Sequence, residues 1–220
     1  MVWHILLAHF VADYPLQIPW ILRNKRHTSF VTIHSGVHLA VMLILVGAER
    51  ARLWPYLVVL AGVHFLIDVA KNLTYKLHPK WVVVPYVVDQ CIHYLAIWIT
   101  AAWIQATLGD TATPFDPLWA ILATSYLVVM YVWFISERIM VYASPSYQAE
   151  VLAQYWPRML TRGGLLTLLL ATTSVPTTVA FAASVTTTVP YIAGKHRWRA
   201  LLTDIGVVCA IWIFIRMATG

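Results

Sequence analysis

Charged residues are scarce in this sequence. Asp, Glu, Lys and Arg make up only 11% of the chain, hydrophobic residues make up 60%, and the mean hydropathy is +0.72. An ordinary soluble domain carries about 25% charged residues. The composition therefore excludes such a domain and predicts a protein that is integral to a membrane.

Several familiar sequence signals are also missing. The two cysteines, Cys91 and Cys209, lie inside apolar segments and are not spaced as a metal-binding pair or a disulfide loop. No P-loop or dinucleotide-binding pattern accompanies the glycines. The first residues lack a basic stretch and a cleavage site, so we expect the first segment to stay in the protein. Without a repeat of fixed period, one compact helical bundle is the simplest expectation.

Apolar runs bounded by polar residues, proline or glycine divide the chain into about seven segments, because a membrane-crossing helix needs about 20 residues. The sequence thus predicts an all-α, polytopic transmembrane bundle of six to seven membrane segments. The expected segments are 3–22, 30–46, 53–70, 82–108, 118–143, 163–183 and 200–218. Pro15 and Pro19 favour a bent or half-crossing first segment, and the sixth segment could equally be an interfacial hairpin.

These segments suggest three regions. Residues 1–143 form a membrane bundle that carries the polar motifs, residues 163–220 form the C-terminal membrane segments, and residues 144–162 form a surface connection. We expect a short amphipathic helix in that connection.

Lys and Arg are distributed unevenly between the apolar segments. Counting them in short connections gives eight on one side and five on the other, and the more basic side is usually cytoplasmic. The larger set consists of Arg23, Lys25, Arg26, Lys71, Lys76, Lys80, Arg158 and Arg162. We therefore expect the amino terminus outside and the polar motifs toward the cytoplasmic side. This distribution also accounts for the net charge of +6, so we expect no nucleic-acid partner.

Polar residues recur as short motifs within these segments. An ionisable group in hydrocarbon costs several kcal/mol unless it is paired, bound to a metal or facing a wet cavity. Residues four apart differ by about 40° around a helix, so each pair faces one direction. The motifs are His9-x3-Asp13-x3-Gln17, His34-x3-His38, His64-x3-Asp68 followed by Lys71, Asp89-Gln90-x2-His93 and Glu137-Arg138. Their positions in the segments predict one polar layer at a common depth.

Imidazole and carboxylate are the usual ligands of zinc, iron and manganese. The best single pair is His34 with His38, because imidazoles at i and i+4 converge on one ion. The candidate metal ligands are His9, His34, His38, His64, Asp68, Asp89 and His93. These exceed the needs of one tetrahedral site, and the surplus could orient ligands, hold a second metal or act as a base.

Other polar residues of the motifs are candidate catalytic groups. Asp13 or Glu137 could act as a general base, and the neutral amides of Gln17 and Gln90 suit the orientation of water or a substrate carbonyl. The pair of Glu137 with Arg138 could close the site or bind an anionic group. Lys71 is also a candidate, although it equally fits the basic residues that mark the cytoplasmic side.

The simplest alternative for any one motif is structural. A single His-x3-Asp or His-x3-His pair arises by chance and often forms a helix-to-helix hydrogen bond worth about 1 kcal/mol. Several pairs at one depth favour a functional polar site instead.

These motifs, in this order and spacing, resemble an uncharacterised bacterial membrane family, domain-of-unknown-function family thirty-three-oh-seven. The resemblance runs from His9 to Arg138, and the chain after Ala143 departs from the pattern. It implies a small multi-helix protein of the bacterial cytoplasmic membrane, and it implies no particular reaction. A looser similarity, through Thr32-Ile33-His34-Ser35, is to membrane-bound metal-dependent hydrolases.

The sequence leaves three functional hypotheses open. The first is a metal-dependent hydrolase that acts on a lipid-like or membrane-accessible substrate, with Zn, Fe or Mn as cofactor. The second is a transporter or proton-relay protein that uses the same layer of His and Asp. The third is a non-catalytic accessory subunit of a larger membrane complex, which could bind a tetrapyrrole. Membrane lipids are the expected partners, together with a membrane protein bound through the C-terminal region.

Overall fold

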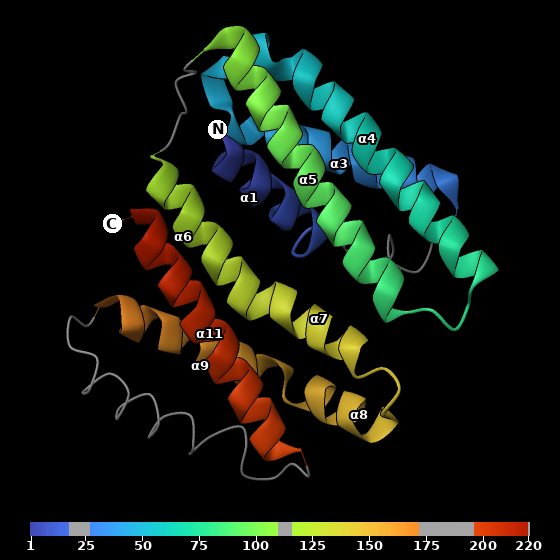
Figure 1. Cartoon of the computed structure of the whole chain (residues 1–220), viewed down its shortest axis with the longest axis vertical. Coiled ribbons are helices and arrows are strands. Elements are labelled where there is room, and N and C mark those ends of the chain that lie inside the picture. The colour runs from blue at the N-terminus through green and yellow to red at the C-terminus, as the bar shows by residue number, and fades with distance from the viewer. Residues whose placement is uncertain (18–26, 110–115, 172–195, 220) are drawn as a thin grey trace. The chain divides into compact units, whose positions relative to one another are not determined.

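The structure is a computed structural model that describes residues 1–17, 27–109, 116–171 and 196–219. All regular secondary structure within these residues is helical, which confirms the predicted all-α class. The α-helices are α1 (Val2–Asp13), α3 (Thr28–Leu45), α4 (Arg50–Leu77), α5 (Val83–Leu108), α6 (Pro117–Leu127), α7 (Trp133–Met140), α8 (Pro145–Ala153), α9 (Tyr155–Ala171) and α11 (Arg197–Thr219). A 3-10 turn, η1 (Gly47–Glu49), precedes α4, and a π-helical stretch, η2 (Val128–Val132), joins α6 to α7 (Figure 1).

Five helical stretches are long and apolar enough to cross a membrane, which confirms a polytopic membrane protein. They correspond to the second, third, fourth, fifth and seventh predicted segments and are Thr28–Leu45, Gly47–Leu77, Val83–Leu108, Pro117–Met140 and Trp198–Thr219. The helical part of the first segment is α1, whose 12 residues rise only about 18 Å. The predicted sixth segment begins within α9, and its residues 172–183 lie outside the described residues.

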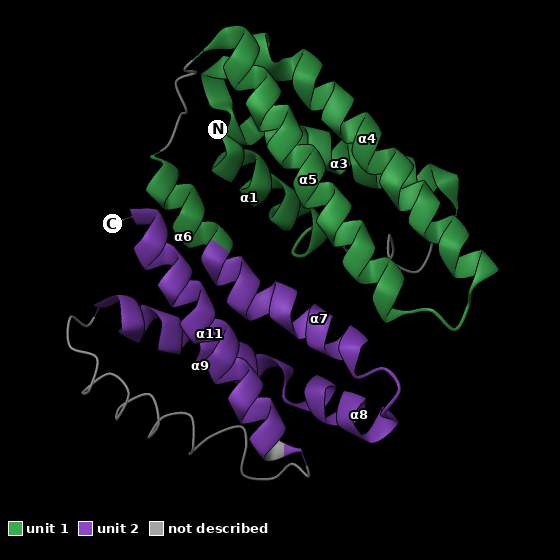
Figure 2. Cartoon of the chain, viewed as in Figure 1, with its two compact units in different colours: residues 1–124 green, residues 125–220 purple. Residues whose placement is uncertain are grey.

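The chain divides into two compact units, residues 1–124 and 125–220 (Figure 2). This boundary lies within α6 and differs from the one at residue 143 that the sequence suggested. The expected surface connection, 144–162, is part of the second unit and contains α8 and the beginning of α9. We describe each unit by itself.

In the first unit, four helices pack in a ring. Helix α1 contacts α3 and α5, and α4 contacts the same two helices (Figure 1). One stripe of each helix therefore faces the middle of the bundle. Along α3 this stripe reads His34, His38 and Met42, and along α5 it reads Asp89, His93 and Ile97, all of them buried.

The inward stripes change from polar to apolar along the helices. Beyond the buried histidines, the stripes continue as an apolar core. This core consists of Ile5, Ala8, Met42, Val46, Leu53, Leu57, Leu60, Ala61, Ile97 and Ile104. Large residues on the other helix faces are exposed, such as Leu66, Leu95 and Trp98, as expected where the solvent is lipid. The apolar core thus orders the four helices whose other halves carry the polar residues.

The end of α4 places Lys71 near the histidines. The helix continues to Leu77, beyond the end at residue 70 that hydropathy suggested. Leu77 is the last helical residue, because His78 precedes Pro79 and a residue before a proline is sterically disfavoured in the helical conformation. Lys71 therefore lies within the helix, three residues after Asp68 and on the same face.

In the second unit, α9 and α11 pack against each other and against η2, and α8 packs against α7. The apolar contact between α7 and α8 is made by Phe134, Val141, Tyr147 and Val151. Gly163 of α9 lies against η2, where a Cβ atom added to the glycine would come within 3.2 Å of the Met130 sulfur. The glycine permits this close approach.

Substitution of Gly163 should be more damaging than substitution of its neighbour. We expect Gly163→Leu to lower the free energy of unfolding by about 1–3 kcal/mol through overpacking against Met130. Gly164→Leu is the matched control, because nothing lies within 4 Å of a Cβ atom there. Thermal unfolding of the two variants in detergent measures the difference, and equal effects would contradict this packing.

Candidate functional site

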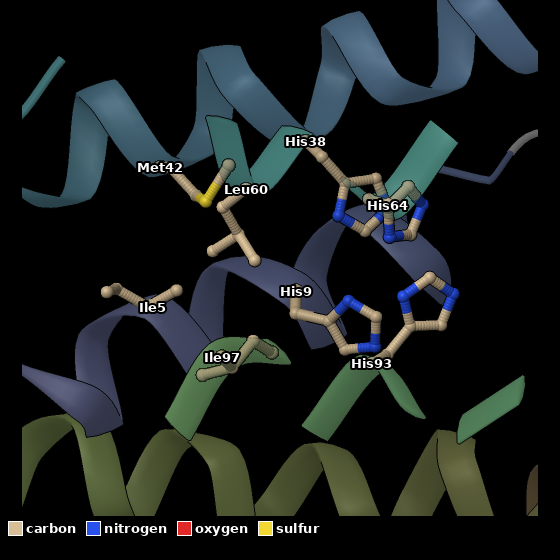
Figure 3. A pocket seen from close by; sticks show the side chains of 8 residues that line it. All are labelled: Ile5, His9, His38, Met42, Leu60, His64, His93 and Ile97. Atoms are coloured by element: carbon tan, nitrogen blue, oxygen red, sulfur yellow. The ribbon is translucent and has the colours of Figure 1, made fainter. Parts of the chain in front are cut away.

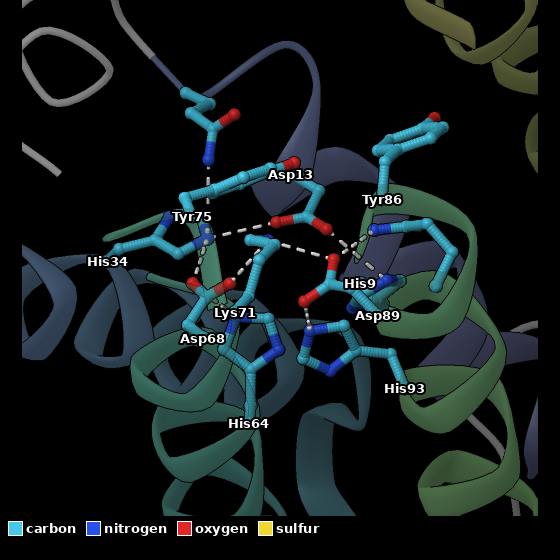
Figure 4. Close-up of polar contacts among 12 residues, drawn as sticks. His9, Asp13, His34, His64, Asp68, Lys71, Tyr75, Tyr86, Asp89 and His93 are labelled. Atoms are coloured by element: carbon cyan, nitrogen blue, oxygen red, sulfur yellow. Dashed lines mark hydrogen bonds and ion pairs between the residues drawn. The ribbon is translucent and has the colours of Figure 1, made fainter. Parts of the chain in front are cut away.

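The four inward stripes bring the predicted metal ligands of the first unit into one cluster (Figure 4). Each helix contributes one pair of residues four positions apart, so both side chains of a pair face the bundle axis. The pairs are His9 and Asp13 on α1, His34 and His38 on α3, His64 and Asp68 on α4, and Asp89 and His93 on α5. All are buried except Asp13, whose side chain is 10% exposed.

Asp13 lies at the junction of three imidazoles. Its Oδ1 atom is 2.9 Å from Nε2 of His34 and 3.1 Å from Nε2 of His38. Those two nitrogens are 3.2 Å from each other. The other carboxylate oxygen, Oδ2, is 3.4 Å from Nε2 of His9. The amide nitrogen of Gln17 lies 3.4 Å from the same His34 nitrogen, at the edge of this group.

Lys71 joins the other two carboxylates. Its ammonium group donates hydrogen bonds to Asp68 at 2.7 Å and to Asp89 at 2.8 Å (Figure 4). The amide of Gln90 also donates to Asp89, at 3.0 Å, and accepts a hydrogen bond from Tyr94 at 3.1 Å. Lys71 therefore belongs to the cluster, and its role as a loop residue that marks the cytoplasmic side is not supported.

The imidazole rings pack directly on one another. The ring centroids of His38 and His64 are 3.7 Å apart, those of His64 and His93 are 4.2 Å apart, and those of His9 and His93 are 5.1 Å apart. Charged imidazolium rings at such distances in a buried site would repel one another. Neutral imidazoles avoid this repulsion, and the neutral form is the one that binds metals.

Hydrogen bonding does not account for the whole cluster. Among the described residues, Nε2 of His9, His64 and His93 is buried without a hydrogen-bond partner, although carboxylate oxygens lie 3.3–3.7 Å away. Unsatisfied buried polar atoms are rare in folded proteins, and each calls for an explanation such as a missing ion or water. Three of them lie together in this cluster.

The formal charges of the cluster are unequal. Asp13, Asp68 and Asp89 bring three negative charges into the cluster, and Lys71 supplies one positive charge. Among the described residues of the cluster, carboxylates therefore outnumber ammonium groups by two, and burying charge of one sign is costly. One divalent cation would neutralise the cluster.

The distances suit metal coordination. At metal–ligand bonds of about 2.1 Å, neighbouring ligand atoms are about 3.0 Å apart in octahedral and about 3.4 Å apart in tetrahedral geometry. The separations of 2.9–3.2 Å between Asp13 Oδ1 and the Nε2 atoms of His34 and His38 fall near this range. Three groups of ligand atoms lie within 4.8 Å of one another: Asp13 with His34, His38 and His64; His9 with His64 and His93; and Asp68 with Asp89 and His93.

A small cavity adjoins the imidazoles (Figure 3). Its volume is about 10 Å³, close to the space that one water molecule needs. His9, His38, His64 and His93 line one end, and aliphatic side chains such as Ile5 and Leu60 line the other.

Glu137 and Arg138 lie in the second unit and do not form the predicted pair with each other. Arg138 is exposed, whereas Glu137 is buried and forms an ion pair with Arg158 at 2.8 Å. Arg158 also binds Asp204 of α11 at 2.7 Å. The hydroxyl of Tyr147 donates to Glu137 at 2.9 Å, and burial raises the pKa of this hydroxyl, so it stays protonated. Glu137 is thus part of a buried ionic network within the second unit.

Arg162 completes this network. Its guanidinium lies 3.1 Å from Asp204 and donates to the backbone carbonyls of Val129 and Met130 in η2. A π-helical turn displaces carbonyls from the regular hydrogen-bond pattern, and the arginine satisfies them. Sequence analysis placed Arg158 and Arg162 in a surface connection, but their exposures are 2% and 1%. The signal that could have revealed the network is Asp204, the lone acidic residue in an apolar helix.

These positions remove the basis of the predicted orientation. Of the eight basic residues counted on the expected cytoplasmic side, Lys71, Arg158 and Arg162 form buried ion pairs inside helices. The remaining residues number five on each side. The distribution of Lys and Arg therefore no longer favours either orientation.

Comparison with known protein families gives a match in the motif-bearing part of the chain. The model of the family described as "Protein of unknown function (DUF3307)" matches residues 1–122. The chain belongs to this family. The matched region contains every residue of the His/Asp cluster and stops before the ionic network of the second unit. No curated protein and no solved structure matches the chain, so the looser similarity to membrane-bound hydrolases gains no support.

Removal of Arg158 should destabilise the second unit strongly. Arg158→Met leaves Glu137 buried without its counter-ion, and we expect a loss of about 3–5 kcal/mol in the free energy of unfolding. Arg138→Met is the matched control, because that side chain is exposed, and its effect should stay within about 0.5 kcal/mol. Thermal or denaturant unfolding in detergent tests this, and equal stability of the two variants would show that the network is dispensable.

Proposed function

We propose that this membrane protein is a metal-dependent hydrolase acting on a lipid-like substrate. The observation that supports the proposal is the convergence of five buried imidazoles and three carboxylates, two of which bind the ammonium of Lys71. Such a set is unfavourable in a membrane bundle without a cation and matches the ligands of zinc, iron and manganese.

Asp13, His34 and His38 are the proposed core of the metal site, because their ligand atoms are already at coordination separations. Three protein ligands are typical of catalytic sites, where an open position takes a water or a substrate atom. A divalent ion there would supply a nucleophilic water near neutral pH and polarise the bond to be cleaved.

The geometry favours a different base from those suggested by the sequence. Both oxygens of Asp13 face imidazoles, and Glu137 is held by Arg158 and Tyr147 in its own network. We place the base at Asp89 instead, because its Oδ1 atom faces one imidazole, Nε2 of His93 at 3.3 Å, while Lys71 holds its other oxygen at 2.8 Å. We propose that Asp89 accepts the proton of the attacking water, while Lys71 fixes Asp89 and stabilises negative charge that develops on the substrate.

A groove between α4 and α5 supports a substrate with a hydrocarbon chain. Its volume is about 510 Å³, within the range of ligand pockets, and most of its lining is apolar, including Ala70, Val88 and Ile92. Lys71 and Asp89 also line it. A chain in the groove would therefore place the attached polar group beside the cluster. We propose a membrane lipid or a similar amphiphile as the occupant.

A proton-relay or transport role is the second candidate. The contacts that favour it are the continuous packing of His34, His38, His64 and His93, which could pass a proton between rings. The excess of carboxylates over ammonium groups among the described residues of the cluster favours a resident cation and ranks this role below the hydrolase.

The first prediction from this proposal concerns metal content. Detergent-purified protein should hold at least one equivalent of zinc, iron or manganese per chain, and the double variant His34→Ala/His38→Ala should lose it. The control is His27→Ala/His78→Ala, two exposed histidines outside the cluster, which should retain the ion. Elemental analysis after gel filtration measures both. A folded protein without transition metal would contradict the proposal and favour the relay.

The second prediction concerns the groove. Ala70→Trp should fill it and raise KM for 4-nitrophenyl octanoate by about tenfold or more, because each buried methylene contributes about 0.8 kcal/mol. Hydrolysis of 4-nitrophenyl acetate and the metal content should not change. Val59→Trp, an exposed position of α4 outside the groove, is the control. Equal effects on the two esters would argue against a chain-binding groove.

A further inference from the structure

The ligand atoms of the cluster fall into two sets on opposite oxygens of Asp13. Oδ1 faces Nε2 of His34 and His38, at 2.9 and 3.1 Å. Oδ2 faces Nε2 of His9, at 3.4 Å, and His9 belongs to a separate group with His64 and His93. A carboxylate whose two oxygens face different ligand sets is placed as a bridge between two ions.

His64 decides how many ions the cluster suits, because its ligand atom lies within reach of both sets. One imidazole nitrogen has one lone pair and binds one ion. If His64 joined Asp13, His34 and His38, that site would be filled by four protein ligands, and His9 and His93 would keep unpartnered nitrogens. If His64 joins His9 and His93, each set has three protein ligands and an open position, as in catalytic sites.

The cavity and the unpartnered atoms favour the second arrangement. Nε2 of His9, His64 and His93 is buried and lacks a hydrogen-bond partner among the described residues, and the three side chains are 3–5% exposed. All three rings line the cavity of about 10 Å³, together with His38 of the first set (Figure 3). Unpartnered nitrogens beside a water-sized space indicate a site for a second ion.

Lys71 argues against a third ion. The remaining group of possible ligands is Asp68, Asp89 and His93. The ammonium of Lys71 already lies 2.7 and 2.8 Å from these two carboxylates and takes the place of a metal cation. His93 is then available to the set with His9 and His64.

From these observations we infer a dinuclear centre, with one divalent transition-metal ion at Asp13, His34 and His38 and a second at His9, His64 and His93. Asp13 bridges the two ions. The inference rests on the proposed function, because it adds a second ion to the same site. Two divalent ions would bring four positive charges, whereas the three carboxylates and Lys71 together carry two negative charges. The open positions therefore suit an anionic oxygen group of a substrate, such as a phosphate ester.

The number of bound ions tests the inference without an activity assay. Elemental analysis should give two equivalents of metal per chain for the full-length protein after reconstitution with Mn²⁺ and gel filtration. His93→Gln removes a ligand of the second set only and should retain one equivalent. His4→Gln is the control, a buried histidine of α1 outside the three ligand groups, and should retain two.

A second measurement needs no variant. Electron paramagnetic resonance of the Mn²⁺-loaded protein should show the spectrum of two spin-coupled ions, since a carboxylate bridge holds the ions close together. Two equivalents with a coupled spectrum support the inference. One equivalent with the spectrum of an isolated ion overturns the second site and leaves the proposed hydrolase intact. No bound metal overturns both.

Discussion

The constraint on which this structure depends is the cost of burying charge. Asp13, Asp68 and Asp89 lie inside a helical bundle, and the ammonium of Lys71 binds two of them. We propose that a cation offsets the remaining negative charge, with the five buried imidazoles around it as candidate ligands. In the second unit, the positive charges of Arg158 and Arg162 balance the negative charges of Glu137 and Asp204. The contrast supports the proposal that the first cluster binds a cation, whereas the arginines of the second unit already balance its carboxylates.

The apolar and polar halves of the first unit depend on each other. The same inward stripes that carry the histidines continue into the core around Leu53, Leu57 and Ile104, which fixes the rotation of each helix about its axis. Without this packing the i and i+4 pairs would not face one another, and the ligand atoms would not converge. In the proposed function, the groove between α4 and α5 would hold a lipid chain beside Lys71 and Asp89, the residues of the cluster that line it.

Much of the site in the first unit could be predicted from sequence, because two simple rules decide it. The helical period places residues four apart on one face, and the depth of each motif in its segment follows from residue counting. These rules do not predict contacts that depend on which helices pack together. They therefore misplaced Glu137, whose partner lies 21 residues away on α9, and treated Arg162 as a loop residue, although it satisfies carbonyls of a π-helical turn. Hydropathy alone also predicted that α4 ends before Lys71. A hydropathy scale scores lysine as polar even where it forms an ion pair inside a helix, as Lys71 does with Asp68.

The account rests on a metal centre among these side chains, and anomalous diffraction from crystals of the protein tests it most directly. Data collected above and below the absorption edge of the metal found by elemental analysis should give an anomalous peak between Asp13 Oδ1 and the Nε2 atoms of His34 and His38. A map with these side chains well ordered and no peak among them would contradict the central claim and leave the cluster as a hydrogen-bonded relay.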